Sequence, residues 1–194
     1  MPQIPPFLQD PAFYALCQGL DQDLADRARA EGCPICNGRL DQAHYPRKPR
    51  GLPSSCQQYA DERYSLCCAR PGCRKRVMPA SVRFLGRKVY LSAIIALVTA
   101  MRHGVTRWRQ AFLRQVLGVS AETLRRWRVF WQEAFAGSDF WRGARGRLMP
   151  PVDPARLPAS LLERFEGDLK EQVLCLLRFI QPLTTGSARK EQAR

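Results

Sequence analysis

The sequence predicts a mainly α-helical fold with one small β unit. Two observations predict it: cysteines pair at short spacing between residues 33 and 73, and apolar residues recur at helical spacing in most of the rest of the chain. We expect six segments in order, which are an N-terminal helix (1–32), a four-cysteine β unit (33–80), a three-helix unit (81–136), a basic and proline-rich linker (137–158), an amphipathic helix (159–181) and a disordered tail (182–194).

The N-terminal helix has clear boundaries. Asp10 is a natural N-cap, Pro11 suits the first helical position, and Gly32 marks the end. One face of this helix is apolar, and it consists of Phe13, Leu16, Cys17, Leu20 and Leu24. We expect this face to pack on the cysteine unit.

Composition indicates a globular protein with an anionic partner. The chain is 45% hydrophobic and carries a formal net charge of +14. Residues 70–147 hold 17 Lys and Arg against three acids, whereas the remaining 14 basic and 14 acidic residues cancel. Charge this localised favours nucleic acid before a membrane surface, and the alternative is a solvated basic face.

Eight cysteines raise the question of redox compartment. The segment Met1–Pro6 has neither the basic nor the apolar region of a signal peptide, so we expect a cytoplasmic, nucleoid-associated protein whose clustered cysteines bind metal. The longest apolar run, 89–101, is shorter than the ~20 residues of a membrane helix and predicts a buried helix instead.

The cysteine spacing predicts a metal site. Cys33 and Cys36 form C-x2-C, Cys68 and Cys73 form C-x4-C, and 31 residues separate the pairs. Two such knuckles joined by β-hairpins make a zinc ribbon, and four thiolates leave no open position, so the Zn²⁺ is expected to be structural. The alternative is four unrelated thiols.

Other residues in this unit compete as ligands. Cys67 neighbours Cys68, but Tyr64, Leu66 and Cys68 share a face by strand alternation, which favours Cys68. His44 and Cys56 lack partner spacing. The basic loop 44–51 is either a minor-groove arm or a solvated hairpin loop.

Three helices are expected after the cysteine unit, over 89–101, 106–117 and 120–135. Gly118 supplies the turn before the third, where positive φ is needed, and Ser120 is its N-cap. Leu124, Trp127 and Trp131 fall on one face and predict burial.

The opposite face of the third helix is rich in arginine. Arg125, Arg126 and Arg128 lie there, and an arginine-lined helix suits the DNA major groove. We expect phosphate contacts from a second basic set, which consists of Arg74, Lys75, Arg76, Arg83 and Arg87.

The C-terminal part offers alternatives. The run 142–147 is either a phosphate-binding arm or a basic linker, and Ser160 with Glu163 reads as a capping box. The helix that follows has an apolar stripe that either packs on the domain or forms a homodimer through residues 160–180. The stripe consists of Leu161, Phe165, Leu169, Val173, Leu176, Leu177 and Ile180.

The chain combines the cysteines Cys33, Cys36, Cys68 and Cys73 with the Arg-Lys-Arg after Cys73 and with residues 117–127. This combination resembles the DNA-binding part of bacterial insertion-sequence transposases or their accessory subunits. There, a zinc ribbon accompanies a helix-turn-helix. The resemblance covers residues 33–136. It implies that Ala121, Glu122, Arg125 and Arg126 touch bases. One position departs from the motif: Arg114 stands four residues before Gly118, where a small residue is usual, and this implies a wider helix crossing or a variant unit.

These patterns predict sequence-preferring binding of double-stranded DNA by a protein that is not an enzyme. The resemblance implies a transposase-related accessory factor that works with a separate transposase or recombinase. The alternatives are a transcriptional regulator and an RNA-binding basic zinc protein. An ordinary helical hairpin with a basic face is the alternative to the helix-turn-helix. A nuclease is disfavoured because the basic region has no spaced carboxylate pair.

Overall fold

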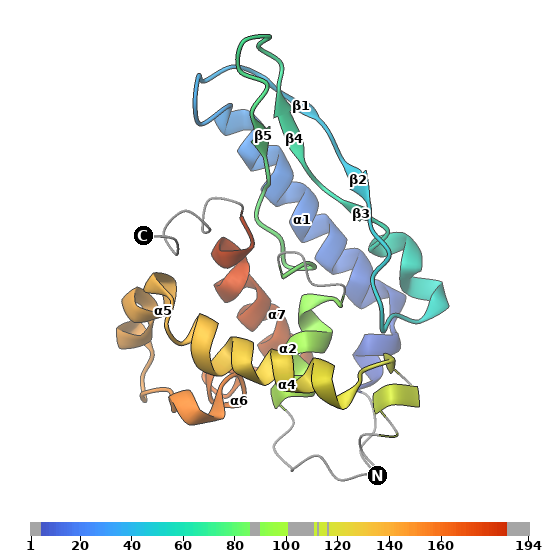
Figure 1. The fold of residues 1–194 in the computed structure, drawn as a ribbon. Coiled ribbons are helices and arrows are strands. Elements are labelled where there is room, and N and C mark those ends of the chain that lie inside the picture. The colour runs from blue at the N-terminus through green and yellow to red at the C-terminus, as the bar shows by residue number, and fades with distance from the viewer. Residues whose placement is uncertain (1–4, 86–89, 101–110, 112, 116, 186–194) are drawn as a thin grey trace.

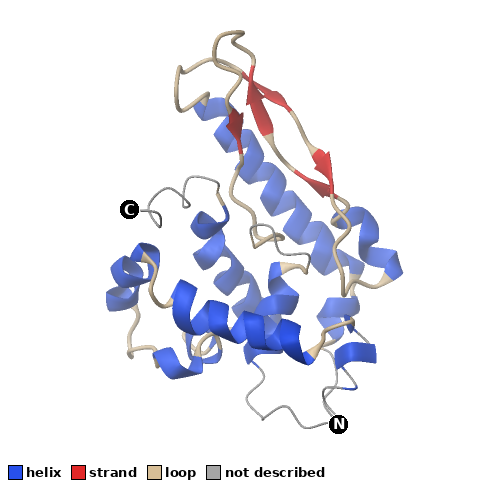
Figure 2. Ribbon diagram, in the orientation of Figure 1, coloured by secondary structure: helices blue, strands red, loops and turns tan. Residues whose placement is uncertain are grey.

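The computed structural model describes residues 5–85, 90–100, 111, 113–115 and 117–185. Figure 1 shows a long helix, α1, with small β-strands laid along one end and a group of shorter helices gathered at the other. Figure 2 shows that the strands occupy one end of the molecule and helices make up most of the rest. The prediction of a mainly α-helical protein with a small β unit is confirmed at this level.

Helix α1 spans Pro11–Glu31 and begins and ends as predicted. The side chain of Asp10 accepts a hydrogen bond from Ala12 N–H, and Gly32 closes the helix at φ 79°. Phe13, Tyr14 and Cys17 are buried against the helical body rather than the cysteine unit, and Ala28 near the far end packs on that unit. Leu16 is 44% exposed, so the predicted apolar face was wrong at that residue.

Two small antiparallel sheets lie beside α1. The first has the order β1 (Leu40–Gln42), β4 (Leu66–Cys68), β5 (Arg76–Val77), with Leu40 opposite Cys68 and Leu66 opposite Val77. The second pairs β2 (Tyr45–Pro46) with β3 (Glu62–Arg63). The 3-10 helix Ser54–Tyr59 lies between them in the chain and packs near Tyr14 of α1 through Cys56.

The helical body holds the main core. Its helices are α2 (Ser92–Ala100), α4 (Ala121–Val129), α5 (Asp139–Ala144), α6 (Ala159–Leu162) and α7 (Leu169–Ile180). A π-helical turn, Phe130–Phe135, continues α4, and 3-10 turns cover Pro6–Gln9, Arg145–Arg147, Pro154–Arg156 and Gln181–Thr184.

The predicted helix 106–117 falls largely outside the described residues; residues 111, 113–115 and 117 are helical. Leu113 and Leu117 are buried, whereas Arg114 is exposed. The Arg114 side chain is therefore exposed to solvent.

The C-terminal part differs from the prediction. Ser160 and Glu163 do not form a capping box, because the Ser160 hydroxyl donates to the Asp153 carbonyl at 2.6 Å and α6 ends after four residues. A capping box opens α7 instead, where Asp168 and Glu171 bond each other's backbone N–H.

The apolar stripe of α7 is buried in the chain's own core, at Val173, Leu176, Leu177 and Ile180. These residues therefore pack on the domain, whereas Leu169 of the same stripe is 41% exposed, and the alternative of a homodimer through residues 160–180 stays a prediction. Residues 137–158, expected as a linker, carry α5 and a fully buried Trp141. In the expected tail, residues 182–184 belong to a 3-10 turn, and residues 186–194 lie outside the described part.

None of the helices among the described residues is long and apolar enough to cross a membrane.

Candidate metal centre and basic helix

Four cysteines come together at the strand end of the molecule. The Sγ atoms of Cys33, Cys36, Cys68 and Cys73 all lie within 4.8 Å of one another. Cys33 and Cys36 follow the end of α1, whereas Cys68 ends β4 and Cys73 lies in the turn between β4 and β5. The spacing argument had selected these four residues, and the structure brings them together.

The loops around the cluster allow the cysteine Sγ atoms to lie close to the backbone. Gly38 leaves room for two thiols, because a Cβ at this position would meet both Cys36 Sγ and Cys68 Sγ at 3.3 Å. Asn37 and Arg74 adopt positive φ, at 54° and 45°, and turn the chain directly after each pair of cysteines. Hydrogen bonds from the backbone N–H groups of Ile35 and Cys36 contribute to lowering the pKa of the Cys33 thiol to about 7. Backbone donors that favour the thiolate are what a metal ligand needs.

The sulfur geometry fits a single tetrahedral ion. Cys33 Sγ lies 3.7 Å from Cys73 Sγ, and Cys36 Sγ lies 3.5 Å from Cys68 Sγ. A tetrahedron with metal–sulfur bonds of about 2.3 Å has edges of about 3.8 Å. Four sulfur donors select zinc or iron over magnesium or calcium, and the donor set is complete without water. The cluster is thus a candidate metal site whose metal the geometry does not distinguish further.

The competing ligands are placed elsewhere. The Cys67 thiol points to the other face of β4, where it donates to the Arg74 carbonyl at 3.6 Å. Strand alternation had favoured Cys68, and this prediction is confirmed. Cys56 is buried in the main core, and His44 Nδ1 lies 3.0 Å from the Ser65 carbonyl. Neither residue takes part in the cluster.

Exposed cations surround this end of the molecule. Arg74, Lys75 and Arg76 directly follow the last cysteine and are exposed. Arg39 and Arg70 are also exposed. Arg39 is paired with Asp41 at 3.1 Å, and the Arg76 guanidinium lies 5.8 Å from the centre of the Tyr45 ring. We call Arg74, Lys75 and Arg76 the tip cations.

The second candidate surface is α4. Gly118 takes φ 63° and its carbonyl accepts a hydrogen bond from the Tyr90 hydroxyl at 2.6 Å, which holds the turn against Tyr90, two residues before α2. The Ser120 hydroxyl caps α4 by accepting from Thr123 N–H at 3.1 Å. Both local predictions are confirmed, and they set where the helix starts.

Helix α4 has a buried and a solvent face. Leu124 and Trp127 are 4% exposed and Trp131 is fully buried, with the Tyr90 and Trp127 rings 5.0 Å apart edge to face. The predicted outward residues follow the opposite pattern: Ala121, Glu122, Arg125 and Arg126 are exposed, and Arg128 is half-buried.

Glu122 organises the exposed face of α4. Its carboxylate accepts from Arg125 Nε and Arg125 Nη2, both at 2.9 Å, and from Arg126 Nε at 3.0 Å. These hydrogen bonds, from Arg125 first and then from Arg126, lower the pKa of Glu122 to about 2. We call these three residues the α4 triad. The carboxylate stays ionised throughout the physiological range.

Two of the residues expected to contact phosphate, Arg83 and Arg87, are not found at the surface that the structure describes. The expectation for Arg83 was wrong, because its side chain is only 1% exposed and pairs with Asp21 of α1 at 2.8 Å. Its guanidinium group is paired inside the protein and is not exposed at the surface. Arg87 lies outside the described residues.

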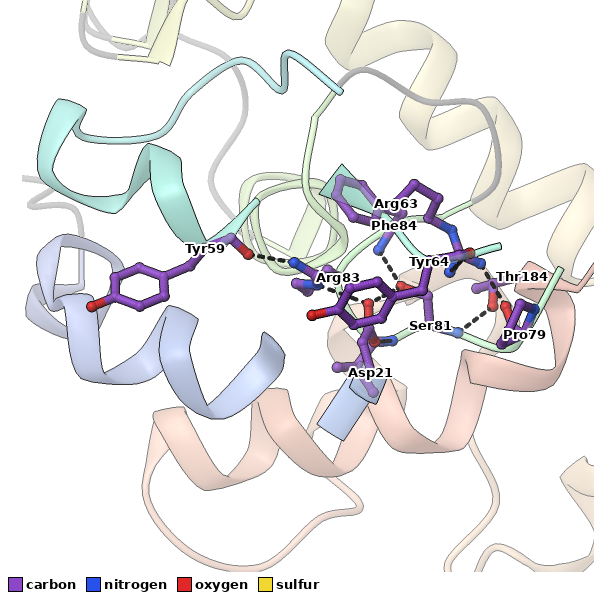
Figure 3. A network of polar contacts seen from close by, with 10 residues as sticks. Asp21, Tyr59, Arg63, Tyr64, Pro79, Ser81, Arg83, Phe84 and Thr184 are labelled. Carbon is purple, nitrogen blue, oxygen red and sulfur yellow. Dashed lines mark hydrogen bonds and ion pairs between the residues drawn. The ribbon is translucent and has the colours of Figure 1, made fainter. Parts of the chain in front are cut away.

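Sequence reasoning missed the network that holds Arg83. Figure 3 shows Asp21 meeting Ser81 and Arg83. The Asp21 carboxylate accepts from Ser81 Oγ at 2.5 Å and from Val82 N–H at 2.6 Å as well as from Arg83. The signal was present, because Asp21 stands four residues after Cys17 on the predicted apolar face, where an unpaired carboxylate is unfavourable.

Comparison with protein-family models, with curated proteins and with solved structures gives no match to this chain.

Proposed function

We propose that the chain binds double-stranded DNA with a sequence preference, through the exposed face of α4. The observation that carries the proposal is the arrangement of this helix. Leu124 and Trp127 anchor it in the core, while Arg125 and Arg126 stand in solvent one turn after a capped N-terminus. An α-helix fits the major groove, and arginine pairs with the two acceptors of guanine.

The segments around α4 support a helix-turn-helix as the unit that presents it. Leu113 and Leu117 before the turn, Val119 within it, and Leu124 and Trp127 after it are all buried in one core. The Val119 N–H donates to the Leu113 carbonyl at 3.1 Å, so the turn is closed by the backbone as well as by Gly118. A turn held in this way fixes the direction in which α4 leaves the domain.

The cysteine cluster is proposed to hold a structural Zn²⁺, which makes the sheet a zinc ribbon. Cys33, Cys36, Cys68 and Cys73 fit the ion as four thiolate ligands. Bound zinc would fix the two loops that carry them. The tip cations then supply phosphate contacts, which position a protein on a duplex without reading its sequence.

We further propose the biological setting of an accessory factor at the ends of a mobile element, working with a separate transposase or recombinase. The support is the combination of a four-cysteine cluster and a basic helix in a chain whose positive charge is concentrated in residues 70–147. A transcriptional regulator would use the same surfaces. The DNA-binding tests below address the activity that both settings share.

Single alanine substitutions test the role of α4. Arg125→Ala and Arg126→Ala are each expected to weaken binding to a selected duplex site by about 1–3 kcal/mol, because each removes a base contact. Binding to unrelated duplexes should change much less. Arg27→Ala is the matched control, since Arg27 is an exposed arginine on α1 outside the basic block. The measurement is fluorescence anisotropy with labelled duplexes at fixed salt.

Three results would count against this assignment. An equal loss on all sequences would make Arg125 and Arg126 phosphate contacts. Unchanged binding in both variants would remove α4 from the interface. Tighter binding to structured RNA than to any duplex, at the same salt, would favour an RNA partner.

A further inference from the structure

The α4 triad has a feature that arginine content alone does not give: a carboxylate stands between the two guanidinium groups. Its side chains remain open to solvent, with 49% of Glu122, 67% of Arg125 and 72% of Arg126 exposed. In a surface that served only to attract phosphate, a carboxylate at this place would be unfavourable, because it repels the DNA backbone.

We propose that Glu122 is a specificity-determining residue that reads the amino group of cytosine, so that the triad recognises a G·C pair. The proposal rests on the DNA binding proposed above. It follows from which hydrogen-bonding groups of the triad are still available when the three side chains are held together.

Counting donors and acceptors gives the pattern that the triad offers. Two carboxylate oxygens have about four acceptor positions. Three are used, because Oε1 accepts from Arg125 Nη2 and Arg126 Nε, and Oε2 accepts from Arg125 Nε. One acceptor position remains on Oε2, and both guanidinium groups keep further N–H donors, since each has five.

This pattern matches one base pair best. In the major groove a G·C pair shows two acceptors, guanine N7 and O6, beside one donor, cytosine N4. Guanidinium donors suit the first two, and a carboxylate suits the third. Adenine also has an amino donor, but in an A·T pair acceptors flank it on both sides, adenine N7 and thymine O4, whereas cytosine N4 has one neighbouring acceptor, guanine O6. A carboxylate at the adenine amino group is therefore repelled from both sides. Thymine and guanine offer the carboxylate no donor in the major groove.

Glu122 also raises specificity by weakening the attraction of the triad to DNA of unrelated sequence. With its charge, the triad carries a formal +1 where the two arginines alone would carry +2. Attraction to phosphate on an unrelated duplex is therefore reduced, and the reduction is offset only where a donor meets the free acceptor. The ion pairs hold the guanidinium groups in place before DNA arrives, so less side-chain freedom is lost on binding.

The test selects preferred sites from a double-stranded DNA library with a randomised centre, using the full chain and the variant Glu122→Gln. Glutamine pairs with adenine N6 and N7. We therefore expect wild-type sites to contain a defined G·C pair and the variant to prefer adenine in place of that cytosine. On the wild-type site, the ratio of specific to non-specific affinity is expected to fall about 5- to 150-fold in the variant, with non-specific binding strengthened.

Glu133→Gln is the matched control. Glu133 is exposed on the π-helical turn that continues α4, so this change removes the same charge without touching the triad. It is expected to keep the wild-type site and the wild-type ratio. Circular dichroism at matched concentration checks that both variants keep their helices.

Each other outcome overturns the inference in a recognisable way. If Glu122→Gln selects the wild-type site with an unchanged ratio, Glu122 reads no base. If the variant binds all duplexes more weakly by one factor, Glu122 only positions the arginines. If the wild-type chain enriches no duplex at all, the proposed DNA binding itself fails, and the reading of cytosine fails with it.

Discussion

The charge of a residue does not show whether its side chain is buried or exposed at the surface. Arg63 and Arg83 are 3% and 2% exposed, and their guanidinium groups lie over the rings of Tyr64 and Phe84 or next to backbone carbonyls. Arg63 Nη2 donates to the Pro79 carbonyl at 2.6 Å. Burial lowers the pKa of Arg63 from its usual value, and Asp21 opposes that shift. A buried carboxylate therefore stabilises cations that a count of surface charge would assign to DNA.

Substitutions at the buried pair separate stability from DNA binding. Asp21→Asn leaves the Arg83 cation without its partner and is expected to cost about 3–5 kcal/mol in the free energy of unfolding. Arg83→Met is expected to cost stability as well, with the DNA affinity of the folded protein unchanged. Urea unfolding followed by tryptophan fluorescence measures the first quantity, and duplex binding measures the second.

Arg74→Met provides the contrast, because Arg74 is exposed beside the cysteine cluster. It is expected to lower duplex affinity and leave the urea midpoint almost unchanged. A stable Arg83→Met protein with weakened DNA binding would contradict the role of Arg83 inside the fold.

At the level of elements, the sheet beside the cysteines is too small to stand by itself. Its strands contain two or three residues, and among the described residues its buried cluster consists of Leu40, Leu66, Cys33 and Cys68. Three short strands with so little apolar surface are marginal in water without a further constraint. A metal ion bound by the four cysteines would link both loops and supply that constraint.

Metal removal is therefore expected to unfold one part of the protein first. With a strong chelator, the backbone amides of β1, β4 and β5 should lose protection from hydrogen exchange, while those of α4 and α7 keep it. Cys68→Ser should have the same effect as the chelator, and Cys67→Ser should not, since the Cys67 thiol lies on the other face of β4. Persistent protection of the strands in metal-free protein would contradict the structural role of the ion.

Local sequence signals predicted some elements well and others poorly, for a physical reason. The ends of α1 and the start of α4 were predictable, because Asp10, Gly32, Gly118 and Ser120 act on their own neighbours in the chain. Strand alternation likewise selected Cys68, since the side-chain direction of a strand depends only on residue parity.

The C-terminal helix was not predictable in the same way. Ser160 with Glu163 and Asp168 with Glu171 have the same capping spacing, and only the second pair is used as a cap. Ser160 is buried and its hydroxyl bonds Asp153 instead. Gly167, at φ 95°, allows the turn that separates the two helices. The two pairs have equally strong local capping signals, and contacts with residues farther away in the chain determine which pair forms the cap. Such contacts also determine that Asp21 and Arg83 form a buried ion pair.

Over the whole molecule, the candidate surfaces lie at different places. The cysteine cluster and the tip cations are at the strand end, near the last residues of α1, and α4 belongs to the helical body (Figure 1). The tip cations and α4 both lie within the part of the sequence that carries the entire positive excess, residues 70–147. Arg63 and Arg83 are buried, whereas the tip cations, Arg125 and Arg126 are exposed to solvent and can attract a polyanion.

The most direct test of this account is the salt dependence of duplex binding by the intact, metal-loaded chain. A protein that neutralises several phosphates is expected to lose about 10³–10⁵ in affinity between about 50 and 200 mM NaCl, with a linear fall of log K against log salt. We expect such a fall for a selected duplex, with a smaller slope after the tip cations are replaced by alanine. Binding that is absent at low salt, or that does not change over this range, would contradict it.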